Sequence, residues 1–288
     1  MIQEQAAGFA SAPATTANLG PAFDCLGLAL DFRCQVSAHL SDTWNVDHVG
    51  QFRPSPAEGD AVLSAARRVV GDARPLALEV ESSIPIGKGL GSSAAAFVAG
   101  AAAALRAVGD EANPDHVFRL TAGLEGHPDN VAAAVYGGLV LVPAEGLPIR
   151  LPIHPTLRVV VAIPATSLPT DDARRVIDTV HAHPVVRRSL ARVAALTAGL
   201  ITGDPQTLAA AHGDEIHEAP RAELSPEVNG LIELAKRAGA LHAARSGSGP
   251  SVVALCAVDQ ASRVAGALRE SGVEVLEATI ATSGLVCG

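Results

Sequence analysis

The sequence is poor in aromatic residues, in sulfur and in positive charge, and each shortage excludes a class of protein. Aromatic residues make up 3% of the 288 residues, so the core must be packed with alanine, valine and leucine. A formal net charge of −9 argues against nucleic acid as a partner. The four cysteines, Cys25, Cys34, Cys256 and Cys287, form no CxxC pair, and we expect reduced thiols; a chain of this size argues against a disulfide scaffold.

Long hydrophobic runs are also missing. The longest, from Ala94 to Leu105, is shorter than the roughly 20 apolar residues that span a bilayer. The first residues, Met1 to Gln5, contain no basic run before an apolar stretch, so we expect neither a signal peptide nor a membrane partner. With 48% hydrophobic residues the chain can bury one large core or two medium ones, and we expect a soluble, cytoplasmic protein.

Apolar periodicity predicts strands and helices that alternate along the chain. Strands are expected at residues 9–14, 26–39, 76–82, 139–142, 158–163, 241–244, 251–257 and 273–279. Helices are expected at residues 60–70, 92–108, 113–126, 129–135, 171–200 with a break near His183, 206–218, 226–239 and 261–271. The Pro- and Gly-rich stretch 143–155 predicts a boundary between domains at residues 1–150 and 151–288.

One segment carries the clearest chemical signal: Pro85-Ile86-Gly87-Lys88-Gly89-Leu90-Gly91-Ser92-Ser93-Ala94-Ala95-Ala96. Glycines let a backbone turn tightly and approach a ligand, and the alanines favour a helix that starts near Ser92. A helix start presents unpaired N–H groups, Lys88 adds a positive charge, and the two serines add hydroxyls that suit a phosphate or a metal. The segment predicts a phosphate-binding loop, although no Gly-Lys-Ser/Thr triplet of the Walker type closes it. A Gly-rich turn before a buried helix is the alternative.

Two further segments gather polar side chains at turns. Asn18 lies in a turn between two predicted strands, and Asp24 follows it between Phe23 and Cys25. Asn and Asp often bond their own backbone in turns, but a carboxylate in apolar surroundings needs a partner, such as the amine or hydroxyl of a substrate. In the second segment, Glu125-Gly126-His127-Pro128-Asp129-Asn130, helix caps explain one or two residues, and Glu125 or Asp129 suits Mg²⁺.

A second Gly/Ser loop and two arginines complete the candidates. The loop Arg245-Ser246-Gly247-Ser248-Gly249-Pro250-Ser251 suits either a backbone anion nest or a tight turn. Arg174 follows Thr170, and Arg221 follows Pro220. Arginines bind carboxylates in bidentate fashion, but most of them are solvated surface groups. From the residues alone, both readings stay open at these positions.

Together these segments resemble the GHMP kinase superfamily, and within it the homoserine kinase family. The loop 85–95 resembles the superfamily's ATP-phosphate motif, and residues 246–251 resemble its C-terminal glycine motif. Segments 13–30 and 125–138 resemble the opening and middle signatures of the homoserine kinases. The resemblance covers nearly the whole chain. It implies an α+β, two-domain GHMP kinase fold, with an N-terminal ribosomal-S5-like α/β domain and a C-terminal ferredoxin-like α+β domain.

The resemblance also implies a function. Members of the family use ATP and Mg²⁺ to phosphorylate the side-chain hydroxyl of L-homoserine on the route to threonine. The matching positions imply an ATP site at residues 85–95, catalytic roles for Asp24, Lys88 and Ser93, and metal ligands among Ser93, Glu125 and Asp129. They imply an amino-acid pocket formed by Asn18, Asp24, His127, Asn130, Thr170, Arg174, Arg221 and Gly249. A homodimer is compatible with the resemblance.

Three residues depart from the family pattern. Ala22 stands where glycine is usual, and Ala61 stands where an asparagine that contacts the nucleotide is common. Arg119 stands at the helix position that often carries the Mg²⁺-binding glutamate. Either Glu125 or Asp129 replaces that glutamate, or ATP and Ser93 hold the metal, or activity is weakened. Two alternative functions therefore stay open: a GHMP kinase for another small amino alcohol or hydroxy acid, and a non-catalytic ligand-binding relative.

Overall fold

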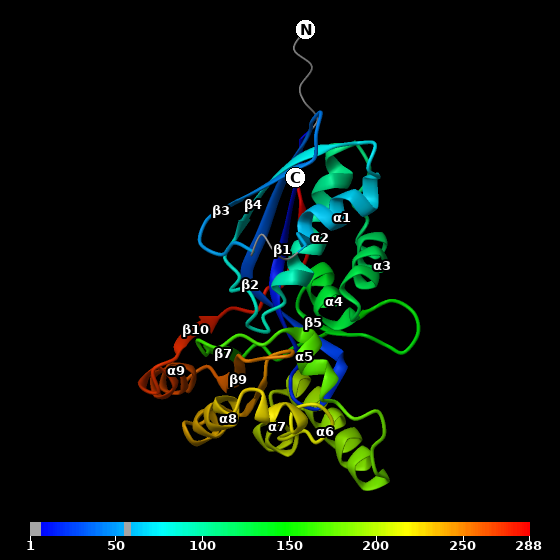
Figure 1. The fold of residues 1–288 in the computed structure, drawn as a ribbon. Coiled ribbons are helices and arrows are strands. Elements are labelled where there is room, and N and C mark those ends of the chain that lie inside the picture. Colours follow the sequence, from blue (N-terminus) through cyan, green and yellow to red (C-terminus); the bar gives the residue numbers. More distant parts are fainter. Residues whose placement is uncertain (1–6, 55–58) are drawn as a thin grey trace.

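Two β-sheets form the frame of the computed structural model, which describes residues 7–54 and 59–288 (Figure 1). The first sheet consists of β1 (Ala7–Asn18), β2 (Ala22–Leu40), β3 (Asn45–Val49), β4 (Leu76–Ser82), β5 (Leu139–Leu141), β6 (Ile149–Leu151) and β11 (Val286–Cys287). Its main order is β11-β1-β2-β4-β3, and β5 pairs with both β2 and β6. Only β3 and β4 run parallel to each other.

Four helices cover one face of this sheet: α1 (Ala61–Val70), α2 (Ser92–Ala107), α3 (Pro114–Glu125) and α4 (Pro128–Tyr136) (Figure 1). The Ala-rich α2 is buried at most of its positions. Its small side chains let its backbone come so close to β1 that a Cβ added at Gly8 would lie 2.1 Å from the carbonyl O of Ala103. Close backbone packing thus replaces the missing aromatic side chains.

The second sheet has the order β10-β7-β9-β8, and all its pairs are antiparallel. Its strands are β7 (Leu157–Ile163), β8 (His242–Arg245), β9 (Val252–Ala257) and β10 (Glu274–Ala278). The helices between them are α5 (Thr170–Arg175), α6 (His183–Thr202), α7 (Pro205–Ala210), the 3-10 turn η1 (Pro220–Glu223), α8 (Glu227–Arg237) and α9 (Ala261–Glu270). If the four strands are numbered along the chain, their order across the sheet is 4-1-3-2, and helices connect the first to the second and the third to the fourth, which confirms the predicted ferredoxin-like arrangement.

Side chains alternate between the two faces of the second sheet because successive residues of a strand point to opposite sides. Val159 and Val161 belong to the large core that also contains the first sheet, α6 and α7. Val160 and Ala162 belong to a separate core under α8 and α9. The second sheet therefore has two buried faces, and one of them joins it to the first domain. Within the described residues, none of the helices combines the length and apolar character needed to cross a membrane.

The end of the chain returns to the first sheet. Ile280 forms a bridge with Leu30, β11 pairs antiparallel with β1, and the N–H of Gly288 donates to the carbonyl O of Phe9 at 3.1 Å. The domain boundary at residue 150 remains a prediction. The structure shows in addition that the last residues of the chain pair with the sheet of the N-terminal half.

Two predicted helices differ from the structure, and three short strands were not predicted. The helix expected at 206–218 ends at Ala210, because Gly213 has a φ of 83° and the Asp214 carboxylate caps the N–H groups that follow it. The break near His183 is wider than expected, since no helix covers residues 176–182. The short strands β3, β6 and β11 were not predicted, because they lie mostly exposed at the margins of the sheet and carry weak apolar alternation.

Candidate active site

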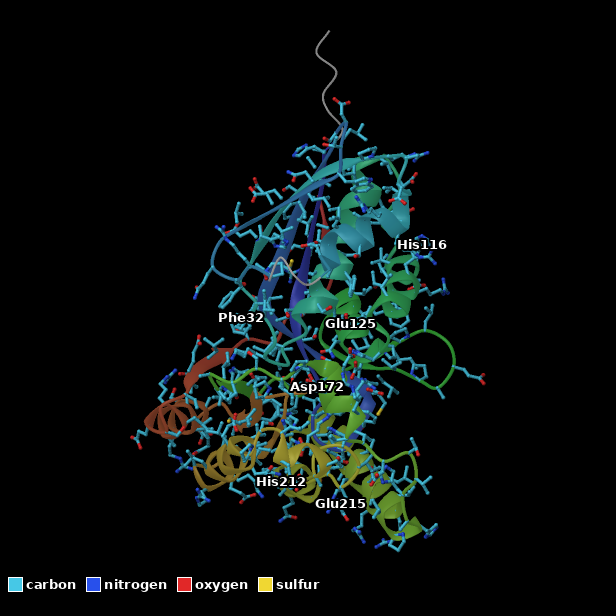
Figure 2. All side chains as sticks on the ribbon, in the orientation of Figure 1. Phe32, His116, Glu125, Asp172, His212 and Glu215 are labelled. Carbon is cyan, nitrogen blue, oxygen red and sulfur yellow. The ribbon has the colours of Figure 1, made fainter. Side chains whose placement is uncertain are left out.

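A cleft between the two domains collects residues that are far apart in the sequence. It encloses about 230 Å³, and Figure 2 shows Glu125 at the end of the helical layer that faces the second domain. The predicted site residues that line it are Asn18, Ile86, Gly87, Gly89, Leu90, Gly91, Ser92, Ser93, Glu125, His127, Asp129, Asn130, Thr170, Arg174 and Arg221. Those that do not line it are Asp24, Pro85, Lys88, Ala94, Ala95 and Gly249.

The glycine-rich loop has a backbone that only glycine adopts easily. Gly87, Gly89 and Gly91 have φ of 68°, 72° and 64°, in the left-handed region. A Cβ on Gly91 would lie 1.9 Å from Thr15 Oγ1, and one on Gly89 would lie 2.2 Å from the carbonyl O of Ser246. The glycines therefore let the loop pass between β1 and the second Gly/Ser loop.

The start of α2 offers donors for an anion. Gly91 caps the helix without a side-chain hydrogen bond, so its first N–H groups have no capping partner, and Ser92 and Ser93 line the cleft beside them. Ser93 Oγ donates to Oε2 of Glu125 at 2.7 Å. Burial raises the pKa of Glu125, and the hydrogen bond from Ser93 opposes that rise. A hydroxyl and a carboxylate thus lie together beside the helix start.

Metal-binding groups are sparse around this pair. Asp129 is buried, and its Oδ1 accepts from the backbone N–H of Asn130 at 2.7 Å. Arg119 is exposed on α3 and does not line the cleft, whereas Glu125 of the same helix does. No cluster of three His, Cys, Asp or Glu side chains suited to a metal occurs in residues 7–54 and 59–288. A metal at Glu125 would therefore share its coordination with phosphate and water.

His127 lies between two carboxylates. Its Nε2 is 3.9 Å from Glu125 Oε1, and its Nδ1 is 3.7 Å from Asp129 Oδ1. Burial lowers the pKa of His127, but Asp129 and Glu125 outweigh burial, and the net shift is upward. The two carboxylates therefore favour the protonated form of this ring more than water does.

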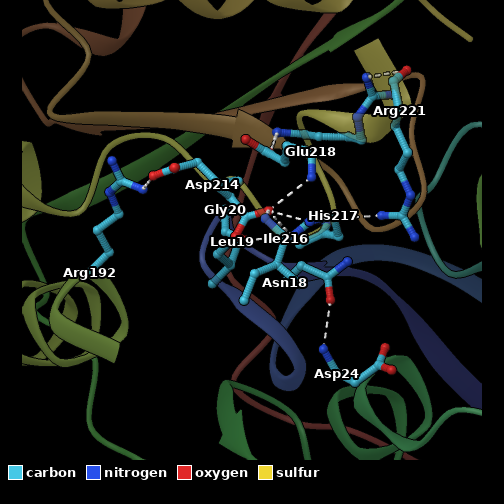
Figure 3. Close-up of polar contacts among 12 residues, drawn as sticks. Asn18, Leu19, Gly20, Asp24, Arg192, Asp214, Ile216, His217, Glu218 and Arg221 are labelled. Carbon is cyan, nitrogen blue, oxygen red and sulfur yellow. Dashed lines mark hydrogen bonds and ion pairs between the residues drawn. The ribbon is translucent and has the colours of Figure 1, made fainter. Parts of the chain in front are cut away.

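The turn between β1 and β2 is strained and tied to the second domain. Asn18, Leu19 and Asp24 have φ of 68°, 49° and 56°, which is uncommon outside glycine. Asn18 Nδ2 donates to the carbonyl O of Gly247 at 3.0 Å, and Asn18 Oδ1 accepts from the N–H of Asp24 at 3.0 Å (Figure 3). Backbone strain persists only where surrounding contacts hold it, and it clusters at functional sites.

Two buried histidines of the second domain hold the same turn. His217 Nε2 donates to the carbonyl O of Gly20 at 2.6 Å, and His242 Nε2 donates to that of Leu19 at 2.8 Å. Burial lowers the pKa of His242 to about 4, and burial also lowers the pKa of His217. Both rings are therefore neutral at pH 7. Sequence reasoning did not identify either histidine, because no motif marks it.

Asp24 and Arg174 form a bidentate ion pair at the edge of the cleft. Nη1 of Arg174 donates to Oδ2 of Asp24 at 3.1 Å, and Nη2 donates to Oδ1 at 2.7 Å. Burial lowers the pKa of Arg174, but Asp24 raises it by more. The two side chains are 32% and 34% exposed, so a ligand can reach both. Thr170, one helical turn earlier, has its Oγ1 3.3 Å from Ser248 Oγ.

Arg221 is a buried cation whose hydrogen-bond partners are all neutral. It is 1% exposed, and Nε donates to the carbonyl O of Ala173 at 2.9 Å. Nη1 donates to Nδ1 of His217 at 2.8 Å (Figure 3). Burial and the neighbouring Arg245 and Arg174 lower the pKa of Arg221 to about 10, which leaves it protonated at pH 7. The wall of the cleft thus holds a positive charge that forms no ion pair with any described carboxylate, although Asp24 and Glu218 act on it from a greater distance.

A second cavity of about 150 Å³ adjoins the start of α2. It shares Ile86, Ser92 and Ser93 with the main cleft. Its other walls are largely apolar and include Cys34, Phe52, Ala61, Val62, Val80 and Ala96. Ala61, where the family commonly has asparagine, therefore faces this second cavity rather than the cleft.

The remaining predicted residues lie around the cleft. Lys88 Nζ donates to three backbone carbonyls of the second domain instead of facing the cleft. Gly249 shapes the second Gly/Ser loop, since a Cβ there would lie 2.5 Å from Arg245 Nη1. Four lining residues were not predicted: Gly247 and Ser248, which belong to a loop that the sequence did single out, and Leu168 and Pro169, which no motif marks.

Known proteins share both the sequence and the fold of this chain. The profiles "GHMP kinases N terminal domain" and "GHMP kinases C terminal" match residues 60–138 and 196–274. A homoserine kinase of Thermus thermophilus is 40% identical over 260 residues, which cover 89% of each chain. The chain belongs to the homoserine kinase family.

Other members of the homoserine kinase family give the same result. A homoserine kinase of Moorella thermoacetica is 38% identical over 253 residues, which cover 85% of this chain and 86% of that one. The crystal structure of homoserine kinase from Cytophaga hutchinsonii matches with a TM-score of 0.86 at 28% identity, and covers 100% of this chain and 99% of its own. The two-domain GHMP kinase fold expected from the sequence is confirmed.

Proposed function

We propose that the protein transfers the γ-phosphoryl group of ATP to the side-chain hydroxyl of L-homoserine and forms O-phospho-L-homoserine. The observation that carries the proposal is Arg221, a buried cation that forms no ion pair with the described carboxylates, next to the accessible pair of Asp24 and Arg174. A zwitterionic amino acid supplies what this wall lacks, because its carboxylate pairs with arginines and its ammonium pairs with an acid or amide. The relatives named homoserine kinase support this acceptor.

The opposite wall of the cleft, which the first domain forms, suits the nucleotide. Unpaired N–H groups at the start of α2 and the open backbone of the loop 87–93 suit the triphosphate. The adjoining apolar cavity suits the base and ribose. Because the two cavities share Ser92 and Ser93, a nucleotide in one and an amino acid in the other meet at the helix start.

Ser93 and Glu125 fit a magnesium ion, because Mg²⁺ prefers oxygen ligands and usually keeps phosphate and water in its shell. When bound, the ion neutralises charge on the phosphate oxygens during transfer. Asp129 is a further candidate ligand, although one of its oxygens already accepts from the Asn130 backbone. Arg119, exposed on the outside of α3, has no part in this site.

Phosphoryl transfer depends mainly on positioning and on neutralised charge. In our proposal Arg174 and Arg221 hold the substrate carboxylate, Asn18, His127, Asn130 and Thr170 shape the pocket, and Gly249 shapes the loop whose residues Gly247 and Ser248 line it. Asp24 orients the substrate and is the candidate to accept the hydroxyl proton. Each of its oxygens accepts one hydrogen bond from Arg174 and keeps a second lone pair for a substrate group.

The proposal is tested by ADP release from Mg-ATP with L-homoserine, its carboxamide and other small amino alcohols as acceptors. We expect turnover with homoserine that depends on Mg²⁺, and little turnover with the uncharged carboxamide. Nucleotide binding without metal-dependent ADP release would contradict the kinase activity and favour a non-catalytic relative. Equal rates with acid and carboxamide would instead point to a GHMP kinase with another acceptor.

The metal assignment makes its own prediction. Ser93→Ala and Glu125→Gln should each lower turnover by about 2–4 kcal/mol of transition-state stabilisation, the cost of losing one preorganised contact. Measured turnover should also need a higher Mg²⁺ concentration to saturate. Arg119→Ala is the matched control on α3 and should leave turnover unchanged, because Arg119 is exposed outside the cleft. Full turnover in both site variants would refute the assignment.

A further inference from the structure

Lys88 belongs to the glycine-rich loop, but its side chain contacts the second domain. Nζ donates to the carbonyl O atoms of Pro164, Ala165 and Thr166 at 2.9, 2.7 and 2.6 Å. An ammonium group has three N–H donors, so these bonds use all of them. The Lys88 carbonyl O also accepts from the N–H of Ser251 at 3.3 Å. A phosphate contact would require the lysine to give up part of this arrangement.

The three carbonyls belong to the segment that connects β7 with α5. This segment starts after Ile163 and leads through Leu168 and Pro169, which line the cleft, to Thr170 and Arg174 on α5. The segment thus carries the part of the cleft that we assign to the amino-acid substrate.

A second contact holds the same segment. Thr166 Oγ1 donates to Glu227, the first residue of α8. Thr166 is thus bonded both to Lys88 on the loop, through its carbonyl O, and to Glu227 on α8, through its hydroxyl. Lys88 is the contact that links it to the phosphate side of the cleft.

We propose that Lys88 is a positioning residue that fixes the acceptor side of the cleft relative to the phosphate-binding loop, and that it does not bind the nucleotide. A compact ammonium suits this task because it can serve three converging carbonyls at once, whereas the planar guanidinium of arginine cannot. The proposal rests on the proposed function for the identity of the two ligands. It changes the role expected for Lys88 from the sequence, which was to offset phosphate charge.

A spectrum of the lysine side chains tests the contact directly. The chain contains two lysines, Lys88 and Lys236, so ¹⁵N-labelled lysine gives two ammonium signals. Lys236 pairs with Glu233 on α8, away from the cleft, and Lys236→Met assigns the signals. We expect the Lys88 signal to be slow in exchange and to keep its position when Mg²⁺ and a non-hydrolysable ATP analogue saturate the protein. A nucleotide-induced shift of Lys88 with Lys236 unchanged would overturn the proposal.

Binding measurements test the consequence. Lys88→Met should raise the Kd and KM for homoserine about tenfold, as expected for lost charge-assisted hydrogen bonds, and leave the nucleotide Kd within about twofold. Lys88→Arg should restore homoserine binding only in part. If the lysine binds phosphate instead, the nucleotide Kd will rise in Lys88→Met, recover in Lys88→Arg, and homoserine binding will stay constant.

The controls separate this proposal from the proposed function. Lys236→Met removes the other lysine and should change neither Kd. A wild-type protein that binds nucleotide but ignores homoserine contradicts the proposed function, while the Lys88 signal and the nucleotide Kd still decide the role of the lysine. If Lys88→Met does not fold, the wild-type spectrum and the Lys88→Arg variant carry the test.

Discussion

The two walls of the cleft recognise charge by different means. The wall from the first domain is a glycine-rich loop and the start of α2, which offer backbone N–H groups and short hydroxyls. The wall from the second domain consists of long side chains, with Arg221 buried against neutral partners and Arg174 paired with Asp24. Partial charges at a helix start suffice for a triphosphate, which brings several negative charges. A single carboxylate brings one charge, and arginines bind it through charge-assisted, bidentate hydrogen bonds.

This difference predicts opposite sensitivities. We call the first-domain side of the cleft the backbone wall and the second-domain side the side-chain wall. The backbone wall binds through main-chain groups, so an added side chain that fills its space should reduce binding. The side-chain wall should fail when charge is removed, because a buried hydrogen-bonded charge pair is costly to break. Substitutions on each wall, with matched controls elsewhere, can therefore test the comparison.

The largest effect is expected from Gly91→Ala, which adds volume to the backbone wall. The new Cβ would lie 1.9 Å from Thr15 Oγ1. That hydroxyl is held in place by its hydrogen bond to Asn130 Oδ1 at 2.8 Å, so it cannot easily move away. Overpacking and left-handed strain together should cost roughly 2–5 kcal/mol of stability and lower nucleotide affinity at least about a hundredfold. Urea unfolding and calorimetry measure the two effects.

Gly109→Ala is the matched control for this prediction. Gly109 has a φ of 83°, close to that of Gly91, but no atom lies within 4 Å of a Cβ added there. The Gly109→Ala variant should lose only the stability that left-handed strain costs, about 1–2 kcal/mol, and should keep its nucleotide affinity. If the two variants lose nucleotide binding equally, the close contact at Gly91 is not what shapes the phosphate site.

A smaller effect is expected from Arg221→Leu, which removes charge from the other wall. Loss of a charge-assisted hydrogen bond to an enclosed carboxylate should weaken homoserine use roughly ten- to a hundredfold. Nucleotide affinity should not change, because the helix start of α2 is on the opposite wall. The variant should also lose most of the preference for homoserine over its carboxamide.

Arg192→Leu provides the comparison outside the cleft, at an ion pair whose side chains are 24% and 37% exposed. Arg192 pairs with Glu215 at 2.8 Å, and Figure 3 shows it on the far side of Asp214 from Arg221. Its removal should change homoserine use very little, since exposed ion pairs contribute about 0–1 kcal/mol. An Arg221→Leu variant that keeps the preference for acid over carboxamide would show that this arginine does not bind the carboxylate.

The two walls also differ in how far the sequence predicts them. The loop and the start of α2 lie where they were predicted, because the glycines, serines and alanines that form them are contiguous. The partners of the side-chain wall come from distant positions. His217 and Gly20 are separated by 197 residues, and His242 and Leu19 by 223. Contacts between residues so far apart produce no periodicity or motif spacing in the sequence, so sequence patterns do not predict them.

In the fold, too, features set by neighbouring residues were predicted, and features set by distant residues were not. Helices such as α1 and α3 were placed correctly, since a capping side chain and an apolar stripe are local signals. Lys88 shows the opposite case. Its position in the loop suggested a phosphate contact, but the carbonyls that accept from it are 76 to 78 residues away. Only the packing of the two domains brings them within reach.

The smallest effect concerns pH and two buried groups behind the side-chain wall. Burial raises the pKa of Glu218 from 4.5 to about 7, and burial lowers the pKa of His242 from 6.5 to about 4. The stability that Glu218 contributes is fully present below pH 4.5 and is lost as the pH rises through 7. The stability that His242 contributes is present above pH 6.5 and is lost as the pH falls through 4. Between these limits the two contributions change in opposite directions, each by about 1.4 kcal/mol per pH unit.

Variants that do not titrate should separate the two contributions. Glu218→Gln removes the group that gains stability in acid, so the free energy of unfolding should fall more steeply with decreasing pH than in the wild type, by about 1.4 kcal/mol per unit. His242→Gln keeps a donor for the Leu19 carbonyl but does not titrate, so the decline should be flatter by a similar amount. His217 shifts in the same direction as His242, so the wild type should still lose stability in acid. Urea unfolding at about pH 6.5, 5.5 and 4.5 measures the three slopes. Equal slopes in all three proteins would mean that these groups are not desolvated in the folded state, and would remove the buried character on which the side-chain wall depends.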